Sequence, residues 1–97
     1  MNRLQYLLCK LAEEASEVAQ IALKTQQFGL DEVYIDKSNK ERCHMELNDL
    51  IGVIALLNAE FNFNFIPDME KVEAKQRKIN EYYKYSVNCG MVNETKV

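Results

Sequence analysis

The sequence is poor in residues that interrupt helices, with one proline and three glycines among 97 residues and none of them in the first 28. No apolar run approaches the roughly 20 residues of a membrane-spanning helix, because the longest extends only from Ile51 to Leu57. A formal net charge of -3 provides no general excess of Lys and Arg for binding nucleic acid. The composition therefore predicts neither a membrane nor a nucleic-acid partner.

Cysteine and histidine are also scarce, with three cysteines and one histidine. Cys9, Cys43 and Cys89 form neither a C-x-x-C pair nor a zinc-ligand spacing, so we expect free thiols in a reducing cytoplasm. Lys10 and Glu13 interrupt the first apolar stretch too early for a secretory signal peptide. Both features predict a cytoplasmic location.

Hydrophobic residues make up 47% of the chain, and near the N-terminus they recur with the i, i+3, i+4 spacing of an amphipathic helix. This spacing predicts a helix from about residue 2 to 27, which Gly29 ends. The connection over 28–37 has room for one helical turn. The apolar positions of the helix are Leu4, Leu7, Leu8, Leu11, Ala15, Val18, Ala19 and Ala22.

A capping box predicts the start of a second helix. Ser38 and Glu41 have the S-x-x-E form, in which the hydroxyl and the carboxylate bind free backbone N–H groups. We therefore expect a helix from about 39 to 61. Gly52 inside this helix suggests close packing against another helix, because glycine otherwise disfavours a helix interior.

The segment Phe61–Phe65 alternates aromatic and polar residues like a strand, but it is short and isolated. We interpret it as a connection with buried aromatic side chains. Asp68 follows Pro67 and is a good N-cap, which predicts a third helix from about 68 to 85.

These expectations give an all-α fold, a small bundle of three main helices in one domain over residues 1–86, followed by a C-terminal tail over 87–97. A domain of this size buries a limited share of its surface. We therefore expect oligomerisation to complete the bundle.

Two acidic motifs stand out, Glu13-Glu14-x-x-Glu17 and Glu46-x-x-Asp49. At about 100° per residue, Glu14 borders the apolar stripe of its helix, Glu17 lies further round, and Glu13 is nearly opposite. Glu46 and Asp49 are one turn apart on an apolar face. Glu14, Glu46 and Asp49 are thus expected to lie at or near a helix contact.

Such carboxylates repel one another, and their pKa values would rise steeply between packed helices unless a cation neutralised them. Mg²⁺ prefers oxygen ligands and suits carboxylates from two facing helices, and Mn²⁺ would also fit. The alternative is a solvated charged face on a non-catalytic helical assembly module, since glutamate is a strong helix former.

A di-iron carboxylate site is a chemical rival, because such bundles use Glu-x-x-His and the chain contains Glu41-x-x-His44. These two residues lie roughly 140° to 160° round the helix from Glu46 and cannot readily share its site. We expect His44 to be a surface residue.

The two motifs together resemble the EExxE and ExxD motifs of the all-α NTP pyrophosphatase superfamily, the MazG-like proteins. The surrounding strings Leu11–Gln20 and Glu46–Leu50 are also similar to that family. The likeness covers roughly residues 4 to 85. It implies Mg²⁺-dependent hydrolysis of an NTP or dNTP to the monophosphate and pyrophosphate.

The resemblance also implies roles for individual residues. Carried over by position, the metal ligands are Glu14, Glu17, Glu46 and Asp49, while Glu13 would bind a further metal or help to activate water. Members of the family commonly complete the site at a subunit interface. A homodimer or homotetramer is therefore the implied state.

A triphosphate also needs cationic partners. Lys75, Lys78 and Tyr82 share one face of the third predicted helix and resemble family positions near the phosphates. Lys24 lies two helical turns beyond Glu17 and is a further candidate. The alternative for all the lysines is an ordinary solvated helix face.

The sequence leaves the substrate open. Phosphoribosyl-ATP pyrophosphohydrolase is an alternative within the superfamily, although its members typically continue past ExxD with an aromatic residue and a histidine, where this chain has Gly52 and Val53. The aromatic residues that could stack on a base, or equally serve as core or interface residues, are Tyr6, Phe28, Phe61, Phe63 and Phe65.

Overall fold

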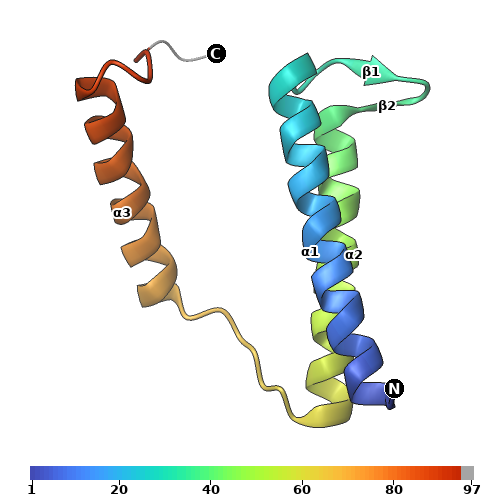
Figure 1. The fold of residues 1–97 in the computed structure, drawn as a ribbon. Coiled ribbons are helices and arrows are strands. Elements are labelled where there is room, and N and C mark those ends of the chain that lie inside the picture. The colour runs from blue at the N-terminus through green and yellow to red at the C-terminus, as the bar shows by residue number, and fades with distance from the viewer. Residues whose placement is uncertain (95–97) are drawn as a thin grey trace. The chain divides into compact units, whose positions relative to one another are not determined.

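The computed structural model describes residues 1–94, so the last three residues of the predicted tail lie outside the described residues. It is mostly helical, with three helices and a small two-stranded sheet (Figure 1). The chain divides into two units, one ending at Phe65 and the other beginning at Ile66, and each is described by itself. The elements are α1 (Arg3–Phe28), β1 (Val33–Tyr34), β2 (Lys37–Ser38), α2 (Asn39–Phe61) and α3 (Met69–Asn88).

Helix α1 lies within a residue of its predicted bounds. Asn2 is its N-cap and forms a capping box with Gln5, a start that the apolar spacing did not reveal. Gly29 ends the helix with a φ of 97°, and its N–H donates to the Thr25 carbonyl at 2.8 Å. A side chain at this position would strain the backbone, so the glycine fixes where the chain leaves the helix.

The connection between α1 and α2 forms a small hairpin, and the expected helical turn is wrong. Val33 pairs with Ser38 and Tyr34 with Lys37, antiparallel, and β-branched and aromatic residues favour this extended conformation. The Asn39 N–H, free at the start of α2, donates to the Glu32 carbonyl at 3.1 Å. The backbone of the connection thus caps the start of α2.

Helix α2 begins as its capping box predicts. The Glu41 N–H donates to Ser38 Oγ at 3.1 Å, and Glu41 Oε1 accepts from the Ser38 N–H at 3.2 Å. Gly52 does not mark a close packing contact, and that expectation is wrong. It is exposed, and an added Cβ would meet nothing within 4 Å among the described residues, whereas the neighbouring Val53 and Ile54 are half-buried.

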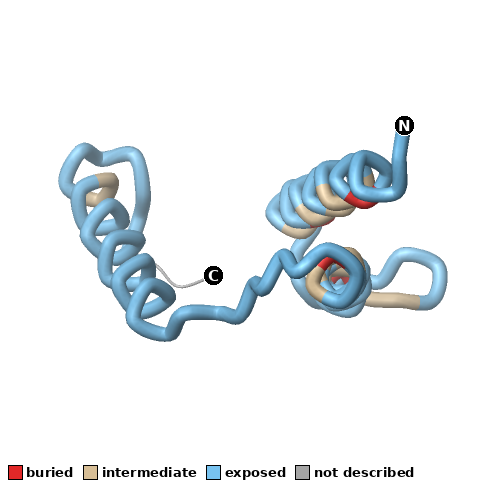
Figure 2. The backbone as a smooth tube through the Cα atoms, turned by 90° about the horizontal axis from the view of Figure 1, so that it is seen from below, coloured by how far each residue is buried: buried red, intermediate tan, exposed pale blue. Residues whose placement is uncertain are grey.

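Helices α1 and α2 pack side by side and antiparallel (Figure 1). Within α1 and α2, the buried and half-buried segments lie mainly where the two helices face each other (Figure 2). Leu7, Ile21 and Leu57 are the buried apolar residues within 1–94, with Leu57 at 0% exposure. At the end where α1 starts, Arg3 donates twice to Glu60, at 2.9 and 3.0 Å. This alignment brings the middles of the two helices together.

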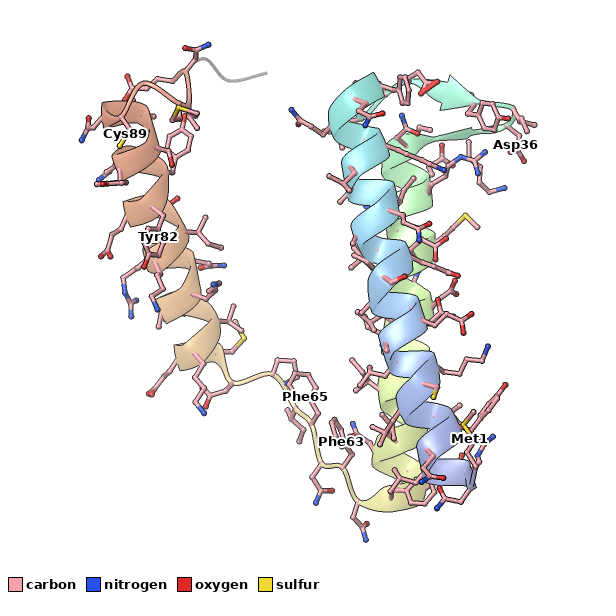
Figure 3. All side chains as sticks on the ribbon, in the orientation of Figure 1. Met1, Asp36, Phe63, Phe65, Tyr82 and Cys89 are labelled. Atoms are coloured by element: carbon pink, nitrogen blue, oxygen red, sulfur yellow. The ribbon has the colours of Figure 1, made fainter. Side chains whose placement is uncertain are left out.

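The segment after α2 is a connection without regular structure, as expected, but its aromatic side chains are not buried. Phe63 and Phe65 are 48% and 49% exposed (Figure 3). Asn62 and Asn64 are left-handed, with φ of 52° and 57°, and turn the chain. The Asn58 side chain binds the backbone N–H and carbonyl of Phe65, both at 2.9 Å, so the connection is tied to α2 by polar groups.

Helix α3 makes up most of the second unit. Asp68 caps it as predicted, because its carboxylate accepts from the N–H groups of Glu70 and Lys71 at 3.1 and 3.3 Å. The helix ends at Asn88, three residues beyond the expected end, and none of its residues is buried. Across the described residues, no helix has the length and apolarity that crossing a membrane requires.

Candidate metal centre

The four acids predicted as metal ligands come together between α1 and α2. Glu14 and Glu17 lie one turn apart on α1, and Glu46 and Asp49 lie one turn apart on α2, which runs in the opposite direction. One carboxylate oxygen from each of the four lies within 4.8 Å of the others. Two short motifs far apart in the sequence therefore build one compact group of oxygen atoms, which we call the acidic cluster.

The acidic cluster is open on one side. Glu14, Glu17 and Glu46 are half-buried, whereas Asp49 is exposed. The Oε2 atoms of Glu14 and Glu46 are buried and have no hydrogen-bond partner among the described residues. Buried polar atoms are nearly always satisfied, so two unpaired carboxylate oxygens in one place fit the donor set of a cation site.

Electrostatics agrees with the geometry. Burial, followed by the neighbouring carboxylates of Glu17 and Asp49, raises the pKa of Glu14 above its ordinary value. The pKa of Glu46 is raised by burial first and then by the same two neighbours. A divalent cation would remove this repulsion and restore the ionised forms.

Glu13 lies outside the acidic cluster. It is exposed, and its Oε2 binds the Lys10 ammonium at 3.2 Å on the surface of α1. This position agrees with its phase on the helix, nearly opposite the apolar stripe. Its part in binding a further metal or activating water stays a prediction.

A pocket of about 690 Å³ begins at the acidic cluster, because Glu17 and Glu46 belong to its lining. From there it extends along α1 to the β1–β2 hairpin. Lys24, one of the predicted substrate contacts, also lines it. Its lining also includes Gln20, Phe28, Tyr34, Asn39 and Arg42.

Buried polar contacts hold the hairpin side of the pocket. Asn39 is 4% exposed, and its Nδ2 donates to the Gly29 carbonyl and to Glu32 Oε2, both at 2.8 Å. Arg42 Nη2 donates to the Tyr34 carbonyl at 2.6 Å. The sequence pattern did not identify these residues, since a single polar residue in the first turns of a helix has no periodicity.

The remaining predicted residues lie elsewhere. Lys75, Lys78 and Tyr82 are exposed on α3, with Tyr82 64% exposed (Figure 3). They belong to the second unit, and their contact with substrate stays a prediction. His44 is an exposed residue, as expected, and is not among the residues of the acidic cluster. Glu41 is engaged in capping α2.

Comparisons with protein-family models, with curated proteins and with solved structures found no match for this chain. The likeness to the MazG-like proteins therefore stays a resemblance in the two acidic motifs. Function is inferred from the acidic cluster and the adjoining pocket.

Proposed function

We propose that the chain is a Mg²⁺-dependent nucleoside triphosphate pyrophosphohydrolase, which converts an NTP or dNTP to the monophosphate and pyrophosphate. The observation that carries this proposal is the acidic cluster itself, four carboxylate oxygens from two facing helices within 4.8 Å of one another. Oxygen ligands of this kind suit Mg²⁺, and Mn²⁺ as a substitute.

The four acids of the acidic cluster would serve as the metal ligands. Glu14 and Glu46 would hold the cation, since each has a buried Oε2 without a hydrogen-bond partner among the described residues, and Glu17 would join them. Asp49 completes the ligand set at the exposed edge, where substrate phosphates can approach. When bound, Mg²⁺ stabilises the negative charge that develops on the phosphate oxygens and on the leaving pyrophosphate.

Other groups serve the substrate and the water. Lys24 lines the same pocket as Glu17 and Glu46, so we assign its ammonium to a phosphate contact. We assign Lys75, Lys78 and Tyr82 to further phosphate contacts from α3. We assign Glu13, which is exposed outside the acidic cluster, to accepting a proton from the attacking water or to binding a further ion.

We also propose that the chain forms a homodimer or homotetramer and is located in the cytoplasm. Exposed apolar surface supports the assembly. The first unit, Met1–Phe65, buries three apolar side chains, and α3 in the second unit buries none. Leu23 and Ile51 remain 65% and 61% exposed. A domain with so small a core needs additional burial, which copies of the chain would provide.

Pyrophosphate release from a panel of canonical NTPs and dNTPs tests the activity. We expect release in Mg²⁺ with at least one substrate, none in EDTA, and a loss of at least about 100-fold in Glu46→Gln and Glu17→Gln, because each removes a metal ligand. Glu73→Gln on α3 is the matched control and should retain activity. Full activity in both ligand variants would show that the ligand assignment is wrong.

The exposed apolar residues also favour a second candidate, a non-catalytic helical assembly module. This candidate has no specific use for the acidic cluster, so the two differ in their response to metal. A ligand that binds only the folded state raises its stability by mass action. An unchanged melting temperature between EDTA and millimolar Mg²⁺ would favour the assembly module.

A further inference from the structure

The pocket that begins at the acidic cluster has the size of a small-molecule site, since such sites span about 300–1,000 Å³. Its far part is lined by two aromatic residues, Phe28 at the end of α1 and Tyr34 in β1. Both are well exposed, 61% and 63%. Ring surface therefore faces open space inside a pocket whose other end holds carboxylates.

The Tyr34 ring is supported from one side. The Arg42 guanidinium lies over it at 5.6 Å from the ring centroid, and Nη2 of the same arginine donates to the Tyr34 carbonyl. Arg42 also lies 3.7 Å from Asp36 at the hairpin tip (Figure 3). One face of the ring is thus engaged, and the other is free to stack without a large loss of side-chain entropy.

Gln20, rather than Arg42, suits the edge of a heterocycle, because the Arg42 guanidinium lies over the engaged face of the Tyr34 ring. The Gln20 side chain is exposed on the pocket wall, and its amide can both donate and accept. Asn39 is already committed to Gly29 and Glu32, so it holds the wall in shape.

We propose that this pocket binds the purine or pyrimidine base of a nucleotide, stacked on Tyr34 and Phe28, with Gln20 at the edge of the base. The inference rests on the proposed function for its orientation, because Glu17 and Glu46 at the other end would place the phosphates at the metal. Glu17 and Phe28 are separated by about 16.5 Å along α1, at 1.5 Å per residue. A base stacked on Phe28 with phosphates at Glu17 therefore requires an extended nucleotide.

Nucleosides without phosphate, added in EDTA, test the base pocket separately from the metal. Adenosine, guanosine, cytidine and uridine are titrated at millimolar concentration into the full chain labelled with ¹⁵N. We expect at least one to shift the amide signals of Gln20, Phe28, Tyr34 and Arg42. No shift with any of the four, or shifts confined to other residues, would overturn the inference.

Variants test whether the Tyr34 and Phe28 rings contribute to nucleoside binding. Tyr34→Ala and Phe28→Ala should each weaken the nucleoside by about 10-fold, because stacking on an aromatic side chain contributes strongly per base. Tyr34→Phe keeps the ring and should bind like the wild type. The matched control is Tyr85→Ala on α3, a tyrosine with a similar exposure of 69%. Unchanged binding in both alanine variants would contradict stacking.

The two proposals can fail independently. Nucleoside shifts in the pocket without any pyrophosphate release would remove the proposed function and leave the base site. Mg²⁺-dependent release with an unchanged KM in Tyr34→Ala and Phe28→Ala would leave the function and remove the base site. If both hold, KM should rise about 10-fold in these two variants, while kcat stays close to that of the wild type.

Discussion

The same two helices meet in two different ways along their length. At one end, which we call the closed end, Leu7 and Leu57 are buried and Arg3 binds Glu60. In the middle, the acidic cluster brings oxygens of four carboxylates within 4.8 Å of one another, and two of their oxygens have no partner among the described residues. The closed end stabilises the helix pair, whereas the middle opposes it in the absence of a cation.

This difference separates the residues that fold the chain from those proposed to act. A sequence optimised only for stability would continue the apolar contact along both helices. Local conflicts of this kind are expected at functional sites and are compensated elsewhere. The closed end supplies part of that compensation, together with the capped start of each helix.

The largest effect is expected from Leu57→Ala, which removes the most buried side chain of the closed end. The free energy of unfolding should fall by about 3 kcal/mol, since a buried leucine replaced by alanine loses burial and leaves a cavity. Chemical denaturation in EDTA and in Mg²⁺ measures the loss, which should be the same in both. Leu56→Ala is the control, since Leu56 is 42% exposed. An equal loss of unfolding free energy in Leu56→Ala would contradict the difference in packing between Leu57 and Leu56.

The second effect concerns pH and the acidic cluster. Because the pKa values of Glu14 and Glu46 are raised above 4.5 on folding, the folded state binds more protons than the unfolded state just above that pH. In EDTA, their contribution to stability is therefore lost as pH rises through the raised pKa values. Mg²⁺ competes with these protons, so it should stabilise the chain more at pH 7.5 than at pH 5. At pH 7.5 and 100 times its Kd, the stabilisation should be about 2.7 kcal/mol.

Melting temperatures across this pH range, in EDTA and in Mg²⁺, provide the measurement. Glu60 serves as the opposite case, because its hydrogen bond to Arg3 lowers its pKa. Its contribution is present above pH 4.5 and is lost as pH falls through the lowered pKa, so Glu60→Gln should leave the Mg²⁺ effect intact. A Mg²⁺ effect that is equal at pH 5 and pH 7.5 would contradict proton competition at the acidic cluster.

Local patterns in the sequence predicted the helices well. Ser38 with Glu41 and Asp68 mark helix starts through contacts within a few residues, and the structure contains both caps. The β1–β2 hairpin could not be predicted in the same way. Its formation depends on backbone bonds that link Leu30 and Glu32 to the start of α2, and short segments carry little signal for such contacts.

The site shows the same division. Helical phase placed Glu46 and Asp49 on an apolar face, and the packing of α1 on α2 brings them near Glu14 and Glu17. The pocket needed more information, because Tyr34 and Arg42 meet only after the hairpin closes on α2. Phase within one helix is readable from sequence, while contacts made by a folded connection are not.

The smallest effect is expected from Gly52→Ala, at an exposed position of α2. An added Cβ meets nothing within 4 Å, and alanine favours a helix interior over glycine. The free energy of unfolding should therefore rise by about 0.5–1 kcal/mol, measured by chemical denaturation. Sedimentation of the same variant distinguishes the two possible outcomes. If stability falls and an oligomer dissociates, the surface of α2 around Gly52 contacts a second copy of the chain. The helix pair would then have a third kind of region, a contact between copies, beside the closed end and the acidic cluster.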